Sequence, residues 1–185
     1  MLFSSTVFLW LFLPTVVVLY YVSHRFLETI WSNVLLLIAS LFFYAWGEPI
    51  YVLLMLFSIA LNYAFGILIE KHREQGRLLL IACVAMNLLI LGYYKYFNFF
   101  VYTINALIGT TVIAGRDIAL PVGISFFTFQ ALSYVIDLYR GDCRVQKNIL
   151  NLALYVSFFP QLIAGPIVRY ADIDEQINNR TVSTE

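Results

Sequence analysis

The sequence has little charge for its length. Charged residues make up 12% of its 185 residues and hydrophobic residues make up 62%, whereas an average soluble domain is about 25% charged. Lysine plus arginine and aspartate plus glutamate balance at 11 each, so no net field would draw the chain to nucleic acid. These figures exclude an ordinary soluble domain and a nucleic-acid-binding protein. We therefore expect an integral membrane protein.

Residues that hold metals or transfer protons are also scarce. The two cysteines, Cys83 and Cys143, lie far apart and lack the Cys/His spacing of a metal or redox site. The two histidines, His24 and His72, each adjoin a basic residue in a charged segment, where nothing would hold a general base against a substrate hydroxyl. We expect no metal site and no bound cofactor, no catalytic role for either histidine, and a helix-packing role for Cys83.

Long stretches without charge run through the whole sequence. A helix needs about 20 apolar residues to cross roughly 30 Å of hydrocarbon, and in lipid a helix satisfies its own backbone. The first stretch lacks the positive start and the cleavage site of a signal peptide, so we interpret it as a retained helix. The sequence predicts an all-α, polytopic transmembrane helical bundle in a single domain, 1–185. Its apolar spans are 1–23, 29–47, 49–69, 78–94, 96–115, 118–136 and 148–168, and an amphipathic tail follows at 171–185.

The basic residues predict how the spans are oriented. His24-Arg25 and the segment 70–77 hold basic residues and should be cytoplasmic, which puts Met1 outside. Six full crossings would then put the basic segment 140–147 outside, against the same rule. One of the spans 96–115 and 118–136 must therefore return to its own side or lie in the interface. We favour 118–136 as the re-entrant span, because Pro121-Val122-Gly123 opens it and its interior is the most polar.

Some polar residues have ordinary structural interpretations. Asn62, Asn87 and Asn98 lie in or beside apolar runs, where amides most often bond one helix to another. Asp137 and Arg140 are three residues apart at a helix end, the spacing of a common surface ion pair.

The stretch from Ser157 to Tyr170, SFFPQLIAGPIVRY, predicts a helix that is broken twice. Pro160 interrupts it first and Gly165-Pro166 interrupts it again. A proline inside a helix costs about 3 kcal/mol, so a membrane helix keeps such breaks only where other groups satisfy the freed backbone. This double break is therefore a candidate site.

Several segments together resemble one family. They are, in order, MLFSSTVFLWLFLPTVVVLYY, LFFYAWGEPIYVLL, LNYAFGILIEK, LPVGISFFTFQALSYVIDLYRG and FFPQLIAGPIVRY. The chain resembles the amino-terminal part of the membrane-bound O-acyltransferase family, in the branch of the bacterial alginate O-acetyltransferases. The resemblance covers essentially all of the chain, and LPVGISFFTFQ and FFPQLIAGPIVR are its most specific motifs.

The resemblance implies a ring of transmembrane helices around a thinned region of the inner (plasma) membrane. There an acyl group passes from a cytoplasmic donor, acetyl-CoA or an acyl-carrier thioester, to a hydroxyl of an extracytoplasmic polysaccharide. The implied partners are membrane lipid, that polysaccharide and an acyl-carrier or periplasmic acetylation protein. The family's catalytic histidine follows the GPIVR element, and neither His24 nor His72 matches it. We therefore expect Glu185 to be a truncation point, no catalytic residue within the chain, and no activity of the chain alone.

Two motifs supply candidates for the wall of a substrate tunnel. Their prolines break helices, their glycines allow close approach and their polar side chains donate hydrogen bonds. The candidates are Pro121, Gly123, Ser125, Gln130, Pro160, Gln161, Gly165, Pro166 and Arg169. Arg169 either binds a lipid phosphate or an anionic part of the donor, or anchors a helix end. Gln130 and Gln161 either face a substrate or bond helix to helix.

The sequence around Ser125 does not match a nucleophile elbow. Ser125 follows Gly123 in the sequence GIS, but Phe127 stands where a nucleophile elbow needs its second glycine.

Two other functions remain open: a component of a transporter or flippase, in which paired broken helices line a binding site, and a non-catalytic membrane scaffold.

Overall fold

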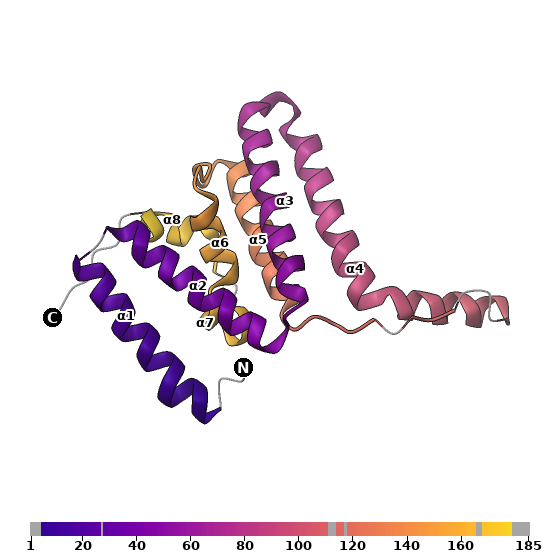
Figure 1. Ribbon diagram of the computed structural model, residues 1–185. Coiled ribbons are helices and arrows are strands. Elements are labelled where there is room, and N and C mark those ends of the chain that lie inside the picture. Colours follow the sequence, from indigo (N-terminus) through magenta and orange to yellow (C-terminus); the bar gives the residue numbers. More distant parts are fainter. Residues whose placement is uncertain (1–4, 27, 111–113, 117, 166–167, 179–185) are drawn as a thin grey trace.

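The computed structural model describes residues 5–26, 28–110, 114–116, 118–165 and 168–178. Over these residues the regular structure is entirely helical (Figure 1). The helices are the π-helical η1 (Phe8–Phe12), α1 (Leu13–Phe26), α2 (Thr29–Gly47), α3 (Tyr51–Lys71), the short η2 (Arg73–Gln75), α4 (Gly76–Ile108), α5 (Ile124–Arg140), α6 (Ile149–Ser157), α7 (Phe159–Ala164) and α8 (Tyr170–Asn178). Helices that are long and apolar enough to cross a membrane cover four stretches, Phe8–Phe26, Thr29–Gly47, Tyr51–Lys71 and Arg73–Ile108. The predicted class, a helical membrane protein, is confirmed.

Helix α4 differs from the two spans that the sequence predicted. It is one continuous helix of 33 residues, about 50 Å long at 1.5 Å per residue and so longer than the hydrocarbon is thick. Figure 1 shows its second half turning away from the bundle and extending sideways, level with the start of α3. The predicted span 78–94 and most of the predicted span 96–115 therefore belong to this one helix. The part that turns away from the bundle is its second half.

Within the predicted span 118–136 the structure forms one helix, α5, and the side of the membrane that each of its ends faces stays a prediction. Helix α5 packs along α3 and α4 and runs from one end of the bundle to the other (Figure 1). Its polar residues Thr128 and Gln130 are buried against neighbouring helices, 1% and 2% exposed. The polarity that suggested a re-entrant segment is explained by helix-to-helix bonding.

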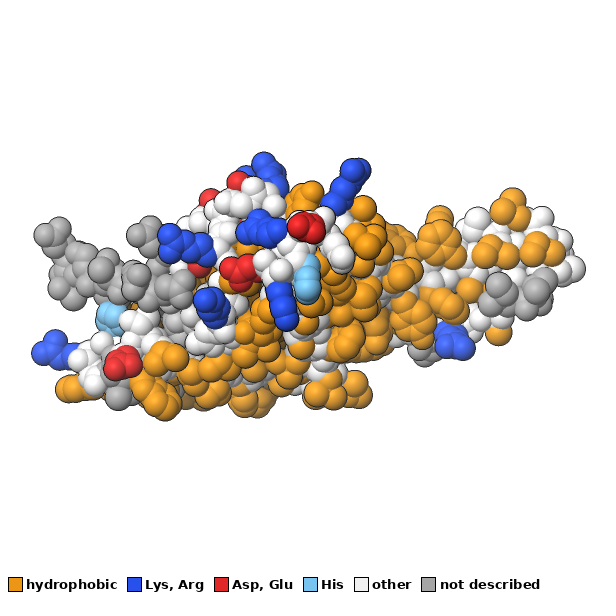
Figure 2. Space-filling model, turned by 90° about the horizontal axis from the view of Figure 1, so that it is seen from above, with side chains coloured by type: hydrophobic (Ala, Val, Ile, Leu, Met, Phe, Trp, Pro, Cys, Tyr) orange, Lys and Arg blue, Asp and Glu red, His pale blue; other side chains and the backbone are white. Residues whose placement is uncertain are grey.

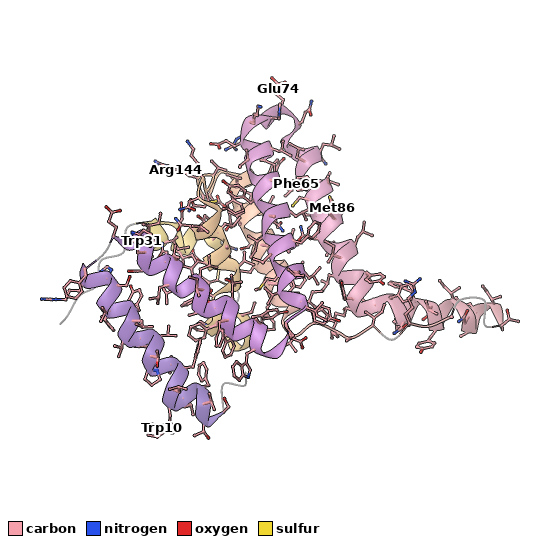
Figure 3. The ribbon with its side chains drawn as sticks, viewed as in Figure 1. Trp10, Trp31, Phe65, Glu74, Met86 and Arg144 are labelled. Atoms are coloured by element: carbon pink, nitrogen blue, oxygen red, sulfur yellow. The ribbon has the colours of Figure 1, made fainter. Side chains whose placement is uncertain are left out.

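The basic segments gather at one end of the molecule. Glu74 and Arg144, from the turns after α3 and α5, lie at the same end of the bundle, and Trp10 lies at the opposite end (Figure 3). Seen from above, this end shows most of the lysine and arginine side chains above a hydrophobic flank (Figure 2). Segment 140–147 thus lies at the same end of the bundle as segment 70–77, as the positive-inside rule requires.

A different segment, residues 149–170, returns to the end where it begins, and we call it the re-entrant hairpin. Its first helix, α6, has 9 residues, about 14 Å at 1.5 Å per residue, and cannot cross the hydrocarbon. Gln146, just before it, donates from Nε2 to Tyr170 Oη, just after it, at 2.9 Å. Asn33, near the first turn of α2, donates to the backbone carbonyl of Ile177 at 3.0 Å. The start and the end of the hairpin therefore lie close together at the basic end of the bundle.

The buried amides of α3 and α4 pair with each other. Asn62 and Asn87 exchange two hydrogen bonds of 3.1 Å, and the Cys83 thiol donates to Asn62 Oδ1 at 3.3 Å. Asn98 in the second half of α4 bonds both the carbonyl and the N–H of Arg116. The interpretation as bonds between helices is confirmed for Asn62 and Asn87, whereas Asn98 bonds a residue outside the helices. Cys83 is a fully buried packing residue.

Candidate functional site at the broken helix

The first break of the re-entrant hairpin falls at Phe158, between α6 and α7. Its backbone, φ −54° and ψ 110°, leaves the helical region. In an unbroken helix the N–H of Phe159 would donate to the carbonyl of Tyr155. Instead, Phe159 N–H donates to Ser40 Oγ of α2 at 3.3 Å, and Gln130 Nε2 of α5 donates to Tyr155 O at 2.8 Å. Two side chains from other helices thus replace one lost backbone bond.

Pro160 lies at a position where its missing N–H removes no hydrogen bond of the helix. It occupies the first turn of α7, and the first N–H groups of a helix have no partner within it. The helix therefore breaks just before the proline, and the proline favours the new start.

The second break depends on Gly165, which ends α7 in an extended conformation. A Cβ at this position would lie 2.6 Å from Gln161 Cα, so only glycine fits without moving backbone. Beyond it, Tyr155 Oη donates to Val168 O at 2.7 Å and lies 2.7 Å from Ser133 Oγ. Pro166 lies outside the described residues.

Gln130 and Gln161, two of the predicted tunnel residues, contact each other. Gln130 Nε2 donates to Gln161 Oε1 at 2.9 Å, in addition to its bond to Tyr155 O. Gln130 is only 2% exposed. The interpretation of these two residues as bonds between helices is confirmed.

A cavity of about 150 Å³ lies beside this contact, between α2, α6, α7 and α8. Of the predicted tunnel residues that the structure describes, Gln161 is the one on its wall. The lining residues are Leu36, Leu154, Tyr155, Phe158, Gln161, Ile173, Gln176 and Ile177.

An apolar groove of about 390 Å³ lies on the other side of the break, against α1. Pro160 lines this groove, and Leu36 and Phe158 line both the groove and the cavity. The two side chains therefore form the partition between the groove along α1 and the interior of the hairpin.

The other predicted residues lie around this centre. Pro121 is buried in the turn before α5, and Ser125 is half-buried in the first turn of α5. Gly123 has φ 78°, and a Cβ there would lie 3.4 Å from Leu162 O of α7. Arg169 is exposed just before α8. Their roles in binding a substrate stay predictions.

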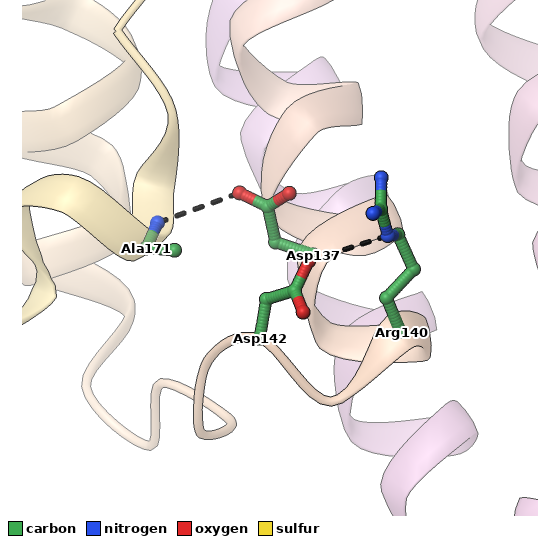
Figure 4. Close-up of polar contacts among 4 residues, drawn as sticks. All are labelled: Asp137, Arg140, Asp142 and Ala171. Atoms are coloured by element: carbon green, nitrogen blue, oxygen red, sulfur yellow. Dashed lines mark hydrogen bonds and ion pairs between the residues drawn. The ribbon is translucent and has the colours of Figure 1, made fainter.

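The expected surface pair between Asp137 and Arg140 was wrong (Figure 4). Arg140 Nε pairs with Asp142 Oδ2 at 3.2 Å, whereas Asp137 is 4% exposed and its Oδ2 accepts the N–H of Ala171 at 3.4 Å. The first N–H groups of α8 need an acceptor, and a carboxylate there also meets the positive end of the helix dipole. The Asp137 carboxylate therefore links α8 to α5. It already occupies the N-terminus of α8, so an anion bound by Arg169 could not also lie there.

Three polar residues that the sequence analysis did not select form hydrogen bonds at or near the two breaks. Ser40, Tyr155 and Gln146 bond groups on other elements, and Ser40 bonds a residue 119 positions away. No local pattern marks such a residue before the fold is known.

Cys143, in the loop after α5, is not an activated thiol. Burial raises its pKa to about 12, with further raising by the nearby carboxylates of Asp137, Asp174 and Asp142. The thiolate is the form that attacks and that ligates metal, so this thiol is inert near neutral pH. Within the described part of the chain, no group of three or more His, Cys, Asp and Glu side chains could hold a metal ion.

Four helices long and apolar enough to cross a membrane, together with a broken helix that lines a small cavity, define a helical membrane protein. The chain is 43% identical to a probable alginate O-acetylase, AlgI, of Pseudomonas aeruginosa over 98% of its own length and 35% of the relative's. A probable alginate O-acetylase of Pseudomonas putida is 42% identical over 98% of the chain and 38% of that relative. A peptidoglycan O-acetyltransferase of Helicobacter pylori is 32% identical over 97% of the chain and 39% of that relative.

The resemblance to the membrane-bound O-acyltransferase family is confirmed by these relatives, and the chain matches the amino-terminal part of such proteins. It spans about 35% of the length of the curated relatives that it matches. No family model matches the chain, and no solved structure matches it.

Proposed function

We propose that the chain forms the amino-terminal part of a membrane-bound O-acyltransferase of the polysaccharide O-acetylation type. The protein would move an acyl group from a cytoplasmic donor to a hydroxyl of an extracytoplasmic glycan. The observation that supports this most is similarity along 98% of the chain to proteins named for O-acetylation of alginate, together with 97% coverage by one named for peptidoglycan.

The re-entrant hairpin supports the same proposal. It begins and ends at the basic end of the bundle, which faces the cytoplasm by the positive-inside rule. Its break lies deeper in the bundle, against Ser40 of α2. A cytoplasmic thioester could therefore approach the interior along the hairpin, and only part of the bilayer would separate it from the glycan.

The donor would be acetyl-CoA or an acyl-carrier thioester, used as a co-substrate, and the protein would need no cofactor of its own. The site would be in the inner membrane, with periplasmic acetylation proteins as partners on the far side. The chemistry would need a histidine, which the family resemblance puts after the GPIVR element and outside this chain.

The test is O-acetylation in cells that lack their own acetylase for alginate or peptidoglycan. The complete reading frame containing this chain is expressed, and ester-linked acetate on each glycan is measured after mild alkaline release. We expect acetate on at least one glycan, and none when residues 1–185 are expressed alone at the same level. Absence of acetate from both glycans with the complete protein would contradict the function, and acetate with residues 1–185 alone would contradict the proposed need for a later histidine.

A further inference from the structure

We propose that the cavity between α2, α6, α7 and α8 binds a short acyl group through its carbonyl oxygen, and that Gln161 Nε2 donates the hydrogen bond. The choice of a neutral thioester as the ligand rests on the proposed function. The site itself rests on the geometry of the break.

The orientation of Gln161 follows from its neighbours. The carbonyl of Tyr155 can only accept, so the Gln130 group 2.8 Å from it is the amide NH₂. The same NH₂ lies 2.9 Å from Gln161, which must therefore present its oxygen to Gln130. This leaves the NH₂ of Gln161 with no bond to another described residue, and Gln161 lines the cavity. A ligand in the cavity that brings an acceptor could accept a hydrogen bond from this NH₂.

The size of the cavity suits a small ligand. Its volume is about 150 Å³, and in another protein an apolar cavity of roughly that volume binds benzene, a ligand of about six heavy atoms. The end of an acetyl thioester, from the methyl group through sulfur to the next two carbons, has about the same number.

The chemistry of the wall favours a neutral ligand. The described residues that line the cavity include no charged side chain, and apolar Leu36, Leu154 and Phe158 surround the space beside Gln161. A free carboxylate would lose its hydration there without gaining a cation. An ester or thioester carbonyl needs only one donor, and its methyl group would pack on the apolar wall.

The experiment measures binding to the chain in nanodiscs made of phosphatidylethanolamine and phosphatidylglycerol. The probe is S-acetyl-N-acetylcysteamine, and the reference ligand is its S-ethyl thioether, which has the same size but no thioester carbonyl. Affinities are measured by competition in saturation-transfer NMR. In the unmodified chain we expect the thioester to bind about fivefold to tenfold more tightly than the thioether, the value of one net hydrogen bond.

Variants of Gln161 test whether this residue causes the preference for the thioester over the thioether. Gln161→Leu and Gln161→Met should bind both ligands equally. Gln176→Leu is the matched control, because Gln176 lines the same cavity from α8 and should leave the preference intact. The ratio of two ligands within one variant does not change when part of the sample unfolds. Equal binding of both ligands by the unmodified chain, no saturable binding, or a preference that survives in the Gln161 variants would overturn the proposal.

The outcome is separable from that of the acetylation test. If the chain prefers the thioester but the complete protein acetylates no glycan, the site stands and the proposed function falls. If the complete protein acetylates a glycan but the chain shows no preference, the function stands and this site falls.

Discussion

The helix pair α3–α4 and the re-entrant hairpin both bury polar groups in apolar surroundings, but they satisfy them differently. In the pair, Asn62 and Asn87 bond each other across two helices whose backbones are intact. In the hairpin, the backbone itself is broken and side chains of Ser40 and Gln130 complete it. In the first arrangement the two amides satisfy each other and link two helices. The second leaves the NH₂ of Gln161 beside a cavity, which is where a ligand can act.

The largest effect should come from Gly165→Ala in the hairpin. The new Cβ would lie 2.6 Å from Gln161 Cα, and backbone must move to relieve the clash. We expect a loss of about 3 kcal/mol in the free energy of unfolding, the upper part of the range for overpacking. Unfolding in mixed micelles monitored by circular dichroism measures it.

Gly92→Ala in α4 is the matched control, because an added Cβ there meets no atom within 4 Å. It should be neutral or stabilise the helix by up to about 1 kcal/mol. Equal stability of the two variants would show that α7 has freedom to move away from Gly165.

A smaller effect is expected in the α3–α4 pair. Asn62→Leu leaves the Asn87 amide without its partner and should cost about 1–2 kcal/mol. The double variant Asn62→Leu/Asn87→Leu removes both amides and should recover part of that loss. Strictly additive losses in the double-mutant cycle would mean that the two amides do not interact.

Ser40→Ala should cost about 1 kcal/mol, because it removes the acceptor of Phe159 N–H. The local signature is faster hydrogen exchange of the Phe159 amide. Ser157→Ala is the control, since Ser157 Oγ donates only to Ala153 O of its own helix. Unchanged exchange at Phe159 in Ser40→Ala would contradict the assignment of Ser40 to the break.

The smallest effect on stability at neutral pH is expected in the loop between α5 and α6. With the pKa of Cys143 at about 12, the thiolate fraction at pH 8 is on the order of a thousandfold below that of an ordinary cysteine. Alkylation by a maleimide should be slow at pH 8 and should rise about tenfold per pH unit up to pH 12. The raised pKa also means that the folded state loses stability as the pH rises above the ordinary thiol pKa. Rapid labelling at pH 7 would contradict the raised pKa of this thiol.

Part of this architecture could be read from the sequence, because long apolar runs and paired prolines and glycines are local signals. They predicted the helices near 29–47 and 49–69 and the double break after Ser157. The sequence predicted a boundary between two spans near residue 95, where α4 instead continues as one helix. The partners of the break could not be read, because Ser40 and Asp137 bond residues far along the chain. The polar residues of α5 predict a re-entrant segment from the sequence alone, and the fold shows that Gln130 and Ser133 among them bond neighbouring helices.

The most direct test of the account asks whether residues 149–170 return to their own side of the membrane. Arg144→Cys, before the hairpin, and Asp172→Cys, after it, both place a thiol at an exposed position. Each is made in a chain with Cys83→Ala and Cys143→Ser, and labelled with a membrane-impermeant maleimide in intact cells and in inverted vesicles. Tyr102→Cys, exposed on the second half of α4, reports the other side.

The account predicts that Arg144→Cys and Asp172→Cys are labelled only in inverted vesicles and that Tyr102→Cys is labelled only in intact cells. Labelling of Arg144→Cys and Asp172→Cys from opposite sides would mean that the broken helix crosses the membrane, and would contradict the re-entrant hairpin.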